Sequence, residues 1–174
     1  LTEALSLCNL AAVGIFGIVL SAAFCEIEWT RRHKLLLVGC TILMLALQGV
    51  VSLRWGTGLA RYLYPLITHL PLWLLLAAMT RRALWPLVSV LTAYLCCQLR
   101  RWAALLVIAL FPAAGTVLQD ATELIVTLPI LLVLIRWIAP SVRALSRSPL
   151  LLQLQFGMIP LLSYLFDYFT RIYT

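Results

Sequence analysis

The sequence predicts an all-α, polytopic transmembrane helix bundle of six to seven spans, and three observations support this prediction. Hydrophobic residues make up 64% of the 174 residues, whereas charged residues make up only 11%. A soluble domain usually carries about 25% charged residues, so a soluble fold of this composition could not cover its own apolar surface. The apolar residues also form long runs, which short arginine clusters with a neighbouring tryptophan separate.

The tryptophan–arginine pairs predict where the chain meets the membrane surface. An indole beside a guanidinium at the end of an apolar run is typical of the membrane–water interface, where the indole lies among lipid headgroups and the arginine reaches phosphate and water. We therefore interpret these residues as interface anchors. They are Trp29, Arg31, Arg32, Arg54, Trp55, Arg82, Trp85, Arg101, Trp102, Arg136 and Trp137.

The lengths of the apolar runs predict the individual spans. A helix needs about 20 apolar residues to cross the hydrocarbon core, and on this criterion residues 1–174 form a single transmembrane module with seven candidate spans. The spans are predicted near residues 5–25, 35–53, 62–79, 84–99, 102–118, 123–138 and 150–169. The connections between them are short, so neighbouring helices are expected to be antiparallel, and no connection is long enough to hold a soluble domain.

The net charge of +7 would suggest nucleic acid as a partner if the chain were soluble. Here the basic residues lie at the ends of the predicted spans, so the lipid bilayer is the expected partner and nucleic acid is not. With seven spans, the two sets of loops differ little in positive charge. This small difference favours a cytoplasmic N-terminus only weakly.

Two prolines, Pro65 and Pro71, interrupt one predicted span. Proline removes a backbone donor and leaves an upstream carbonyl without its helical partner, which neighbours or water must satisfy inside a bilayer. His69 lies one turn after Pro65 on the same face, and Tyr64 precedes the kink. An ionisable side chain at a kink indicates a ligand pocket or a moving joint. The alternative is an ordinary proline kink with His69 hydrogen-bonded inside the bundle.

A second group of polar and aromatic residues lies near the end of the chain. Pro160 predicts another kink, and Tyr164, Asp167 and Tyr168 follow it at helical spacing. Asp167 either anchors the end of the helix or belongs to an aromatic-rimmed site near the membrane surface. Glu123, at the other acidic position of interest, is expected to accept backbone amides at the start of the sixth span.

The cysteines and histidines predict no metal site and no catalytic site. The five cysteines show no zinc-ligand spacing and no disulfide framework. His33 and Cys40 are seven residues apart, and a membrane cysteine peptidase would need such a histidine near its nucleophile. Cys40 lies inside an apolar run, where a thiolate is disfavoured, so this function remains a minor alternative.

Three groups of residues resemble a known family. They are Tyr64-Pro65-Leu66-Ile67-Thr68-His69-Leu70-Pro71, then Ala93-Tyr94-Leu95-Cys96-Cys97-Gln98 with Trp102, and then Phe156-Gly157-Met158-Ile159-Pro160 with Tyr164, Phe166-Asp167-Tyr168 and Tyr173-Thr174. In these motifs the chain resembles the membrane sensor region of sensor histidine kinases that carry a GHKL-type ATPase domain. Such kinases are found in Firmicutes, and their layout is similar to that of quorum-peptide receptor kinases of the accessory gene regulator type.

The resemblance implies that this chain is the signal-sensing input module of a bacterial two-component system in the cytoplasmic membrane. It implies an extracellular peptide or small-molecule signal and a homodimer formed through the full-length kinase. ATP and magnesium would serve only a kinase domain after Thr174, so this segment is expected to be non-enzymatic and without a cofactor. A small-molecule transporter, or its substrate-binding membrane subunit, is the first alternative, because broken helices with few buried polar groups also fit that class.

Overall fold

The computed structural model describes residues 2–110 and 116–173; it does not describe the side chains of residues 2–4, 57, 60, 61, 116 and 171–173. All regular elements in the described residues are helices, which confirms the all-α prediction. They are α1 (Thr2–Phe24), α2 (Arg31–Tyr64), η1 (Pro65–His69), α3 (Leu70–Thr80), α4 (Leu84–Ile108), α5 (Thr116–Val133), η2 (Leu134–Ile138), α6 (Ala139–Leu145) and α7 (Leu150–Tyr173). Thr174 and the side chains of Arg171 and Tyr173 lie outside the described residues.

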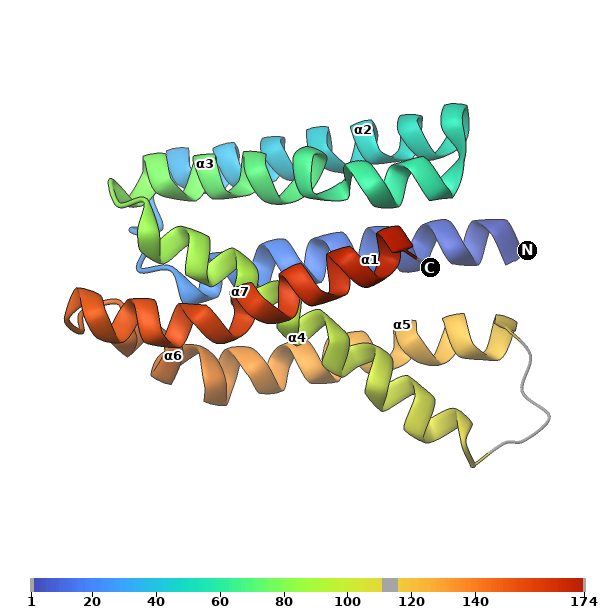
Figure 1. The fold of residues 1–174 in the computed structure, drawn as a ribbon. Helices are drawn as coiled ribbons and strands as arrows, with labels where there is room; N and C mark the ends of the chain where they lie inside the picture. Colours follow the sequence, from blue (N-terminus) through green and yellow to red (C-terminus); the bar gives the residue numbers. More distant parts are fainter. Residues whose placement is uncertain (1, 111–115, 174) are drawn as a thin grey trace.

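Six helical segments of the described chain are long and apolar enough to cross a membrane. They are Leu5–Phe24, Arg31–Gly56, Tyr62–Thr80, Leu84–Ile108, Val117–Leu145 and Leu150–Thr170. Successive segments run in opposite directions, so the start of α1 and the end of α7 lie at the same end of the bundle (Figure 1). We call this the terminal end. The opposite end, with the α1–α2, α3–α4 and α6–α7 connections, is called the basic end.

The predicted spans at 84–99 and 102–118 are not separate helices. A single helix, α4, runs through Arg100 and Arg101 as far as Ile108, and residues 111–115 of the predicted fifth span lie outside the described residues. The two arginines were expected to mark a loop at the interface. Arg100 instead lies inside the bundle, 5% exposed and paired with Glu123, so its charge does not force the helix to end.

The hairpin of α2 and α3 turns at Gly56, which separates the two predicted spans at 35–53 and 62–79. Gly56 has φ 85° and ψ 163°, a conformation that residues with a Cβ rarely adopt. Arg54 and Trp55 precede it and are exposed at the terminal end. The turn therefore occurs where the sequence places both an interface pair and a flexible residue.

Each of the two π-helical turns in the described chain comes just before a proline. In η1 the N–H of Leu70 donates to Pro65 O, five residues back, and Pro71 follows. In η2 the N–H of Ala139 donates to Leu134 O in the same way, and Pro140 follows. A proline within a helix lacks an N–H and clashes with the carbonyl four residues earlier, so the wider turn accommodates it.

The core of the bundle lies around α1 and α4. One apolar cluster joins α1 and α4 to η2 and α6, and includes Phe16, Phe24 and Ala139. A second cluster joins α1 and α4 to the α2–α3 hairpin and includes Ile18 and Leu72. Helix α7 lies across α4 and is mostly exposed along its length. Two central helices thus hold three peripheral units, the α2–α3 hairpin, the α5–α6 segment and α7.

Trp85 differs from the other predicted interface anchors. It is 2% exposed, and its Nε1 donates to Phe24 O at 3.1 Å, while Arg143 donates to Ala23 O at 2.8 Å. These bonds satisfy carbonyls at the end of α1, which otherwise have no partner inside the helix. Trp85 is therefore a core residue that caps α1, and it is not a headgroup anchor. The other predicted anchors, from Trp29 to Trp137, have exposed side chains.

At the basic end, an ion pair links the α1–α2 connection to the α6–α7 connection. Arg147 Nε donates to Glu26 Oε1 at 2.8 Å, and Arg147 Nη2 contacts the same oxygen. The hydrogen bond from Arg147 lowers the pKa of the Glu26 carboxyl below its usual value. Both side chains are exposed, so the pair contributes little to stability by itself.

Gly157 sets the distance between α7 and α4. A Cβ added at Gly157 would lie 2.8 Å from Val88 Cγ2, which is closer than side chains can pack. Valine is stiff about χ1 in a helix and cannot rotate away easily. We expect Gly157→Ala to lower the free energy of unfolding by about 1–3 kcal/mol, as overpacked cores do. The measurement is reversible unfolding of the protein in lipid nanodiscs or mild detergent.

The control for this prediction is Gly39→Ala, because a Cβ at Gly39 meets nothing within 4 Å. Replacing glycine by alanine in an open helix position stabilises the helix, so this variant should be as stable as the parent or more stable. Combining Gly157→Ala with Val88→Ala should restore part of the lost stability. If Gly157→Ala unfolds like the parent, the close approach of α7 to α4 is wrong.

Candidate functional site

A cavity of about 770 Å³ lies among α1, the α2–α3 hairpin, α4, α5 and α7. Its lining reaches from Ser6 and Gln119 at the terminal end to Ser21 and Leu72 deeper in the bundle. Cavities of 300–1,000 Å³ are typical of small-molecule sites. Its walls combine an aromatic cluster near the middle of the membrane with a group of charged and amide side chains nearer the terminal end.

The aromatic cluster surrounds His69, the last residue of the π-turn η1. The His69 ring makes edge-to-face contacts with Tyr64 at 4.9 Å, Tyr94 at 5.2 Å and Tyr164 at 5.3 Å between ring centroids. Its Nδ1 lies 3.0 Å from the Tyr164 hydroxyl, within hydrogen-bond distance. Edge-to-face packing suits the positive edge and negative face of aromatic rings. Residues from three separate helical segments therefore hold this histidine in place.

The cluster extends along α7 towards the terminal end. The Tyr94 hydroxyl donates to Asp167 Oδ2, the rings of Tyr94 and Tyr164 meet at 4.8 Å, and Tyr168 stacks parallel to Tyr164 at 6.4 Å. Asp167 thus has a hydrogen-bond partner on α4. This contact links the mostly exposed α7 to the central helix by a polar bond as well as by packing.

The structure brings the two groups of predicted site residues into one cluster. Tyr64 and His69 come from the first group, and Tyr164, Asp167 and Tyr168 from the second, with Tyr94 between them. Two of the three predicted prolines adjoin the π-turn beside this cluster, whereas the predicted kink at Pro160 is not seen as a break in α7. Pro65 begins the π-turn, Pro71 follows it, and Pro160 lies buried in α7 one turn before Tyr164.

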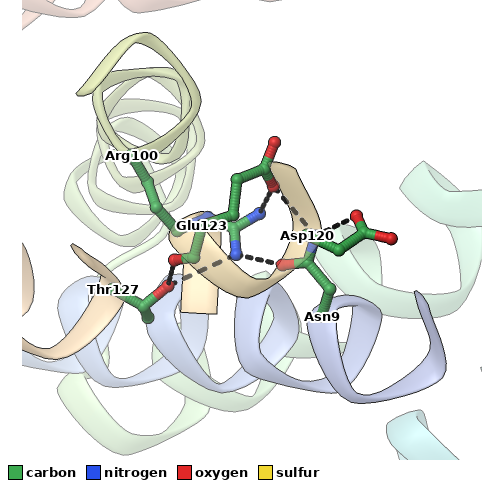
Figure 2. Close-up of polar contacts among 5 residues, drawn as sticks. All are labelled: Asn9, Arg100, Asp120, Glu123 and Thr127. Atoms are coloured by element: carbon green, nitrogen blue, oxygen red, sulfur yellow. Dashed lines mark hydrogen bonds and ion pairs between the residues drawn. The ribbon is translucent and has the colours of Figure 1, made fainter. Parts of the chain in front are cut away.

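The second part of the cavity wall is a buried polar network centred on Arg100 (Figure 2). Arg100 Nη2 lies 3.0 Å from Glu123 Oε2, and Nη1 donates to Asn9 Oδ1 and, at 3.3 Å, to Thr127. The Asn9 amide in turn donates to Glu123 Oε2 at 2.9 Å and to Asp120 Oδ1 at 3.1 Å. Three helices, α1, α4 and α5, meet at this network.

The network lies close to the boundary of the hydrocarbon core. Arg100 is sixteen positions after Leu84, the start of α4, which places it about 24 Å along the helix axis from the basic end. With the start of α4 taken as the edge of a hydrocarbon core about 30 Å thick, Arg100 lies nearer the boundary at the terminal end than the middle of the core. His69 is eleven positions before Thr80, the end of α3, about 16 Å from the basic end and thus near mid-membrane.

The expectation that Glu123 caps the start of a helix is wrong. Glu123 is 7% exposed, lies inside α5 and accepts bonds from Arg100 and Asn9. Sequence reasoning also missed Asn9 and Arg100 as site residues. The sequence did contain one indication of this site. Glu123 and Thr127 are four residues apart, so a helix over residues 116–133 has both polar side chains on one face.

The residues of the suggested cysteine peptidase lie apart. His33 and Cys40 are on the same helix, seven positions and about 10 Å apart along its axis, which is too far for direct proton transfer. The His33 ring bonds to Glu28 O, and Cys40 packs against the apolar cluster that contains Ile18 and Leu72. Among the described side chains, no group of three or more His, Cys, Asp or Glu residues could hold a metal ion.

Removing one partner of the buried ion pair should be much more damaging than removing both. We expect Arg100→Met or Glu123→Leu alone to cost about 3–5 kcal/mol of unfolding free energy, because each leaves an uncompensated buried charge. The double variant should recover much of that loss. A double-mutant cycle of unfolding in nanodiscs measures the coupling.

The matched control is Arg101→Met, which removes the neighbouring arginine, whose side chain is exposed. Its effect on stability should stay within about 0.5 kcal/mol, as is usual for surface substitutions. Additive losses in the cycle would show that Arg100 and Glu123 do not interact in the membrane.

Comparisons with known proteins give no function for this site, so only its geometry indicates what it does. Searches against protein-family models, curated proteins and solved structures found no match for the chain.

Proposed function

We propose that this chain is the membrane-embedded sensing module of a bacterial two-component sensor histidine kinase in the cytoplasmic membrane. One observation carries the proposal: a single cavity joins the aromatic cluster around His69 to the Arg100 network, and the π-turn η1 forms part of its wall. A ligand in this cavity would contact a deformable segment of backbone directly. The resemblance of the motifs around Tyr64, Tyr94 and Pro160 to GHKL-domain kinases supplies the class of receptor.

The proposed mechanism uses the π-turns as joints. A π-turn before a proline has fewer helical hydrogen bonds to break than an uninterrupted helix, so two packings can lie close in energy. A peptide or small-molecule signal that contacts His69 and Tyr168, which both line the cavity, would favour one packing of η1 against α7. To change the module from mostly off to mostly on, the signal must prefer one state by roughly 5.5 kcal/mol.

With six spans in place of the seven predicted from the sequence, the positive charges favour the opposite orientation of the chain in the membrane. The basic residues nearer the basic end are Arg31, Arg32, Lys34, Arg81, Arg82, Arg136, Arg143 and Arg147. Those nearer the terminal end, by their place in the chain, are Arg54, Arg61, Arg100, Arg101 and Arg171. Lysine and arginine concentrate in cytoplasmic loops. We therefore place the basic end in the cytoplasm and the cavity mouth outside, which reverses the weak preference drawn from seven spans.

In this arrangement the segment itself performs no chemistry. ATP and magnesium would be bound by the kinase domain of the same polypeptide, and the homodimer would form through that domain. The bilayer is the permanent partner of the module, and the signal is its transient one. The segment would pass a change of helix packing onwards through α7, the last described helix.

The reading frame after Thr174 tests this proposal directly. Because both ends of the described chain are at the terminal end, which we place outside, a cytoplasmic kinase requires an odd number of further spans. We expect sequencing of the gene to reveal one additional apolar segment of about 20 residues, then a helical linker and an ATP-binding domain. A stop codon close after Thr174, or a kinase domain with no intervening span, would contradict the proposal.

A small-molecule transporter is the second candidate, and the π-turns favour it specifically. Transporters bind substrate near mid-membrane at broken helices, and His69 lies at that depth beside η1. The two functions differ in the sides of the membrane to which the cavity opens. A transporter must open its site to both sides of the membrane in turn, whereas a receptor of the proposed kind keeps its cavity open to one side.

Cys97, which lines the cavity, reports this access. In a variant that keeps Cys97 and replaces Cys8, Cys25, Cys40 and Cys96 by alanine, we expect a membrane-impermeant maleimide to label Cys97 from outside only. Right-side-out and inside-out vesicles supply the two sides. A variant that keeps only Cys8, exposed near the terminal end, identifies the outside. Labelling of Cys97 from both sides would favour the transporter, and labelling from neither would contradict an open cavity.

A further inference from the structure

The α2–α3 hairpin packs into the core of the bundle in the half that lies nearer the basic end. There Met44 of α2 and Leu72 and Leu76 of α3 share one buried apolar cluster with Ile18 of α1 and Val90 of α4. Close packing of this kind is what holds helices together inside a membrane. This half of the hairpin is therefore fixed to the two central helices.

The half of the hairpin nearer the terminal end packs on itself. Val51, before the turn at Gly56, and Leu63, after it, form a separate apolar cluster with Ile67 of η1. This cluster has no member from α1 or α4 among the described residues. We call residues 48–64 the hairpin tip. Its apolar packing joins its two arms into one unit but does not attach that unit to the central helices.

The cavity lies between the hairpin tip and α1. Gln48 lines the cavity on the hairpin side, and Asn9 and Leu10 line it on α1. Gln48 is 3% exposed, and its amide has no hydrogen-bond partner among the described residues. The amide is not one of the fully enclosed unpaired atoms of the described chain, so it is accessible from the cavity. Because an unpaired amide is costly inside a membrane, either a polar group that enters the cavity or a movement of the tip must satisfy it.

Helices α1 and α2 approach closely at the point where the fixed half of the hairpin meets the tip. A Cβ added at Gly14 of α1 would lie 3.0 Å from Leu45 Cδ2 of α2. Leu45 is three positions before Gln48 and fourteen after Arg31, which places it about 21 Å from the basic end. Gly49, with nothing within 4 Å of an added Cβ, follows at once and weakens the helix there.

The second arm of the hairpin has its π-turn at the same depth. Counted back from Thr80, η1 lies about 16–22 Å from the basic end. Pro71 has no N–H, so the Ile67 carbonyl lacks a helical donor four residues later. His69, at the end of η1, is held by ring contacts with α4 and α7. Both arms therefore change from fixed to less constrained at one level of the membrane.

From these features we infer that the hairpin tip is a gate of the cavity. It pivots at the Gly14–Leu45 contact and at η1, towards α1 to close the cavity and away from α1 to open it. Closing brings the Gln48 amide to the polar side chains of the opposite wall, which supply the hydrogen-bond partner that it lacks. This movement is parallel to the membrane plane, so Arg54 and Trp55 stay at the interface.

The gate goes beyond the proposed function, because it concerns how a ligand enters the cavity. A receptor would use the gate to retain its signal, and a transporter would use it as one of two gates. The absence of a downstream kinase, or labelling of Cys97 from both sides, would therefore contradict the sensor and leave the gate standing.

Distances between two spin labels test the gate on the full chain in nanodiscs. One label is attached to Cys8 of α1 and the other to Leu53→Cys in the tip, both at exposed positions. The matched pair joins Cys8 to Leu35→Cys, an exposed position in the fixed half of α2. The other cysteines are replaced by alanine; they are Cys25, Cys40, Cys96 and Cys97.

Double electron–electron resonance gives the distribution of each distance. We expect more than one maximum between Cys8 and Leu53→Cys, and a single narrow maximum between Cys8 and Leu35→Cys. Because both pairs share the Cys8 label, movement of α1 alone would broaden both distributions. Two equally broad distributions, or a single narrow maximum for both pairs, would overturn the inference.

Two proline variants test whether η1 is the joint. Pro71→Ala restores the missing N–H, so η1 should become ordinary helix and the distance from Cys8 to Leu53→Cys should narrow to one maximum. Pro140→Ala is the matched control, because Pro140 follows the other π-turn, η2, in the α5–α6 segment. It should leave the distribution as in the parent. Equal narrowing by both variants, or none by Pro71→Ala, would contradict a joint at η1.

Gln48→Leu tests the direction of the movement. Leucine is similar in size but needs no hydrogen-bond partner, and Leu10 and Val13 of α1 line the same cavity. Apolar contact across the cavity should then favour the closed position. We expect the distance from Cys8 to Leu53→Cys to shift to its shorter maximum, while the matched pair stays unchanged. A shift to the longer maximum, or no shift, would contradict closure of the tip onto α1.

Discussion

Arg100 carries a permanent positive charge inside a transmembrane helix, and much of the architecture depends on how the bundle neutralises it. A guanidinium cannot lose its proton in a protein, so burial requires a permanent partner. Glu123 on α5 and Asn9 on α1 supply that partner and its supporting hydrogen bonds. Because these residues belong to different helices, satisfying one charge fixes how α1, α4 and α5 pack near the terminal end of the bundle.

The pairing of Arg100 with Glu123 is also linked to the number of spans and to the end of the bundle at which α1 begins and α7 ends. With its charge compensated, Arg100 can remain inside α4, and this helix continues to Ile108 without a break. An even number of crossings then places the start of α1 and the end of α7 together (Figure 1). The number of crossings decides which charged loops share a side of the membrane. A single buried ion pair therefore affects which charged loops lie at the same end of the bundle, which is the distribution that the positive-inside rule uses.

A second constraint acts at the prolines, because the bilayer offers no water to backbone groups. The wide turns η1 and η2 accommodate Pro71 and Pro140 while the helices continue across the membrane. At η1 this solution leaves the Thr68 hydroxyl without its usual backbone acceptor and turns His69 towards the tyrosines of α4 and α7. The wide turn before one proline thus forms part of the polar wall of the cavity.

The sequence alone determined the fold class, most of the spans and the aromatic part of the site. Long apolar runs bounded by residues such as Trp55 and Arg136 leave a bilayer as the only suitable solvent, and spacing along one helix places Tyr64, Pro65 and His69 together. Only the tertiary structure decided the roles of Arg100, Glu123 and Trp85. An arginine in an apolar stretch reads as a loop until its partner is known, and that partner is 23 residues away on another helix. Local patterns follow from backbone geometry and hydropathy, whereas the neutralisation of a buried charge depends on contacts between helices that the order of residues does not contain.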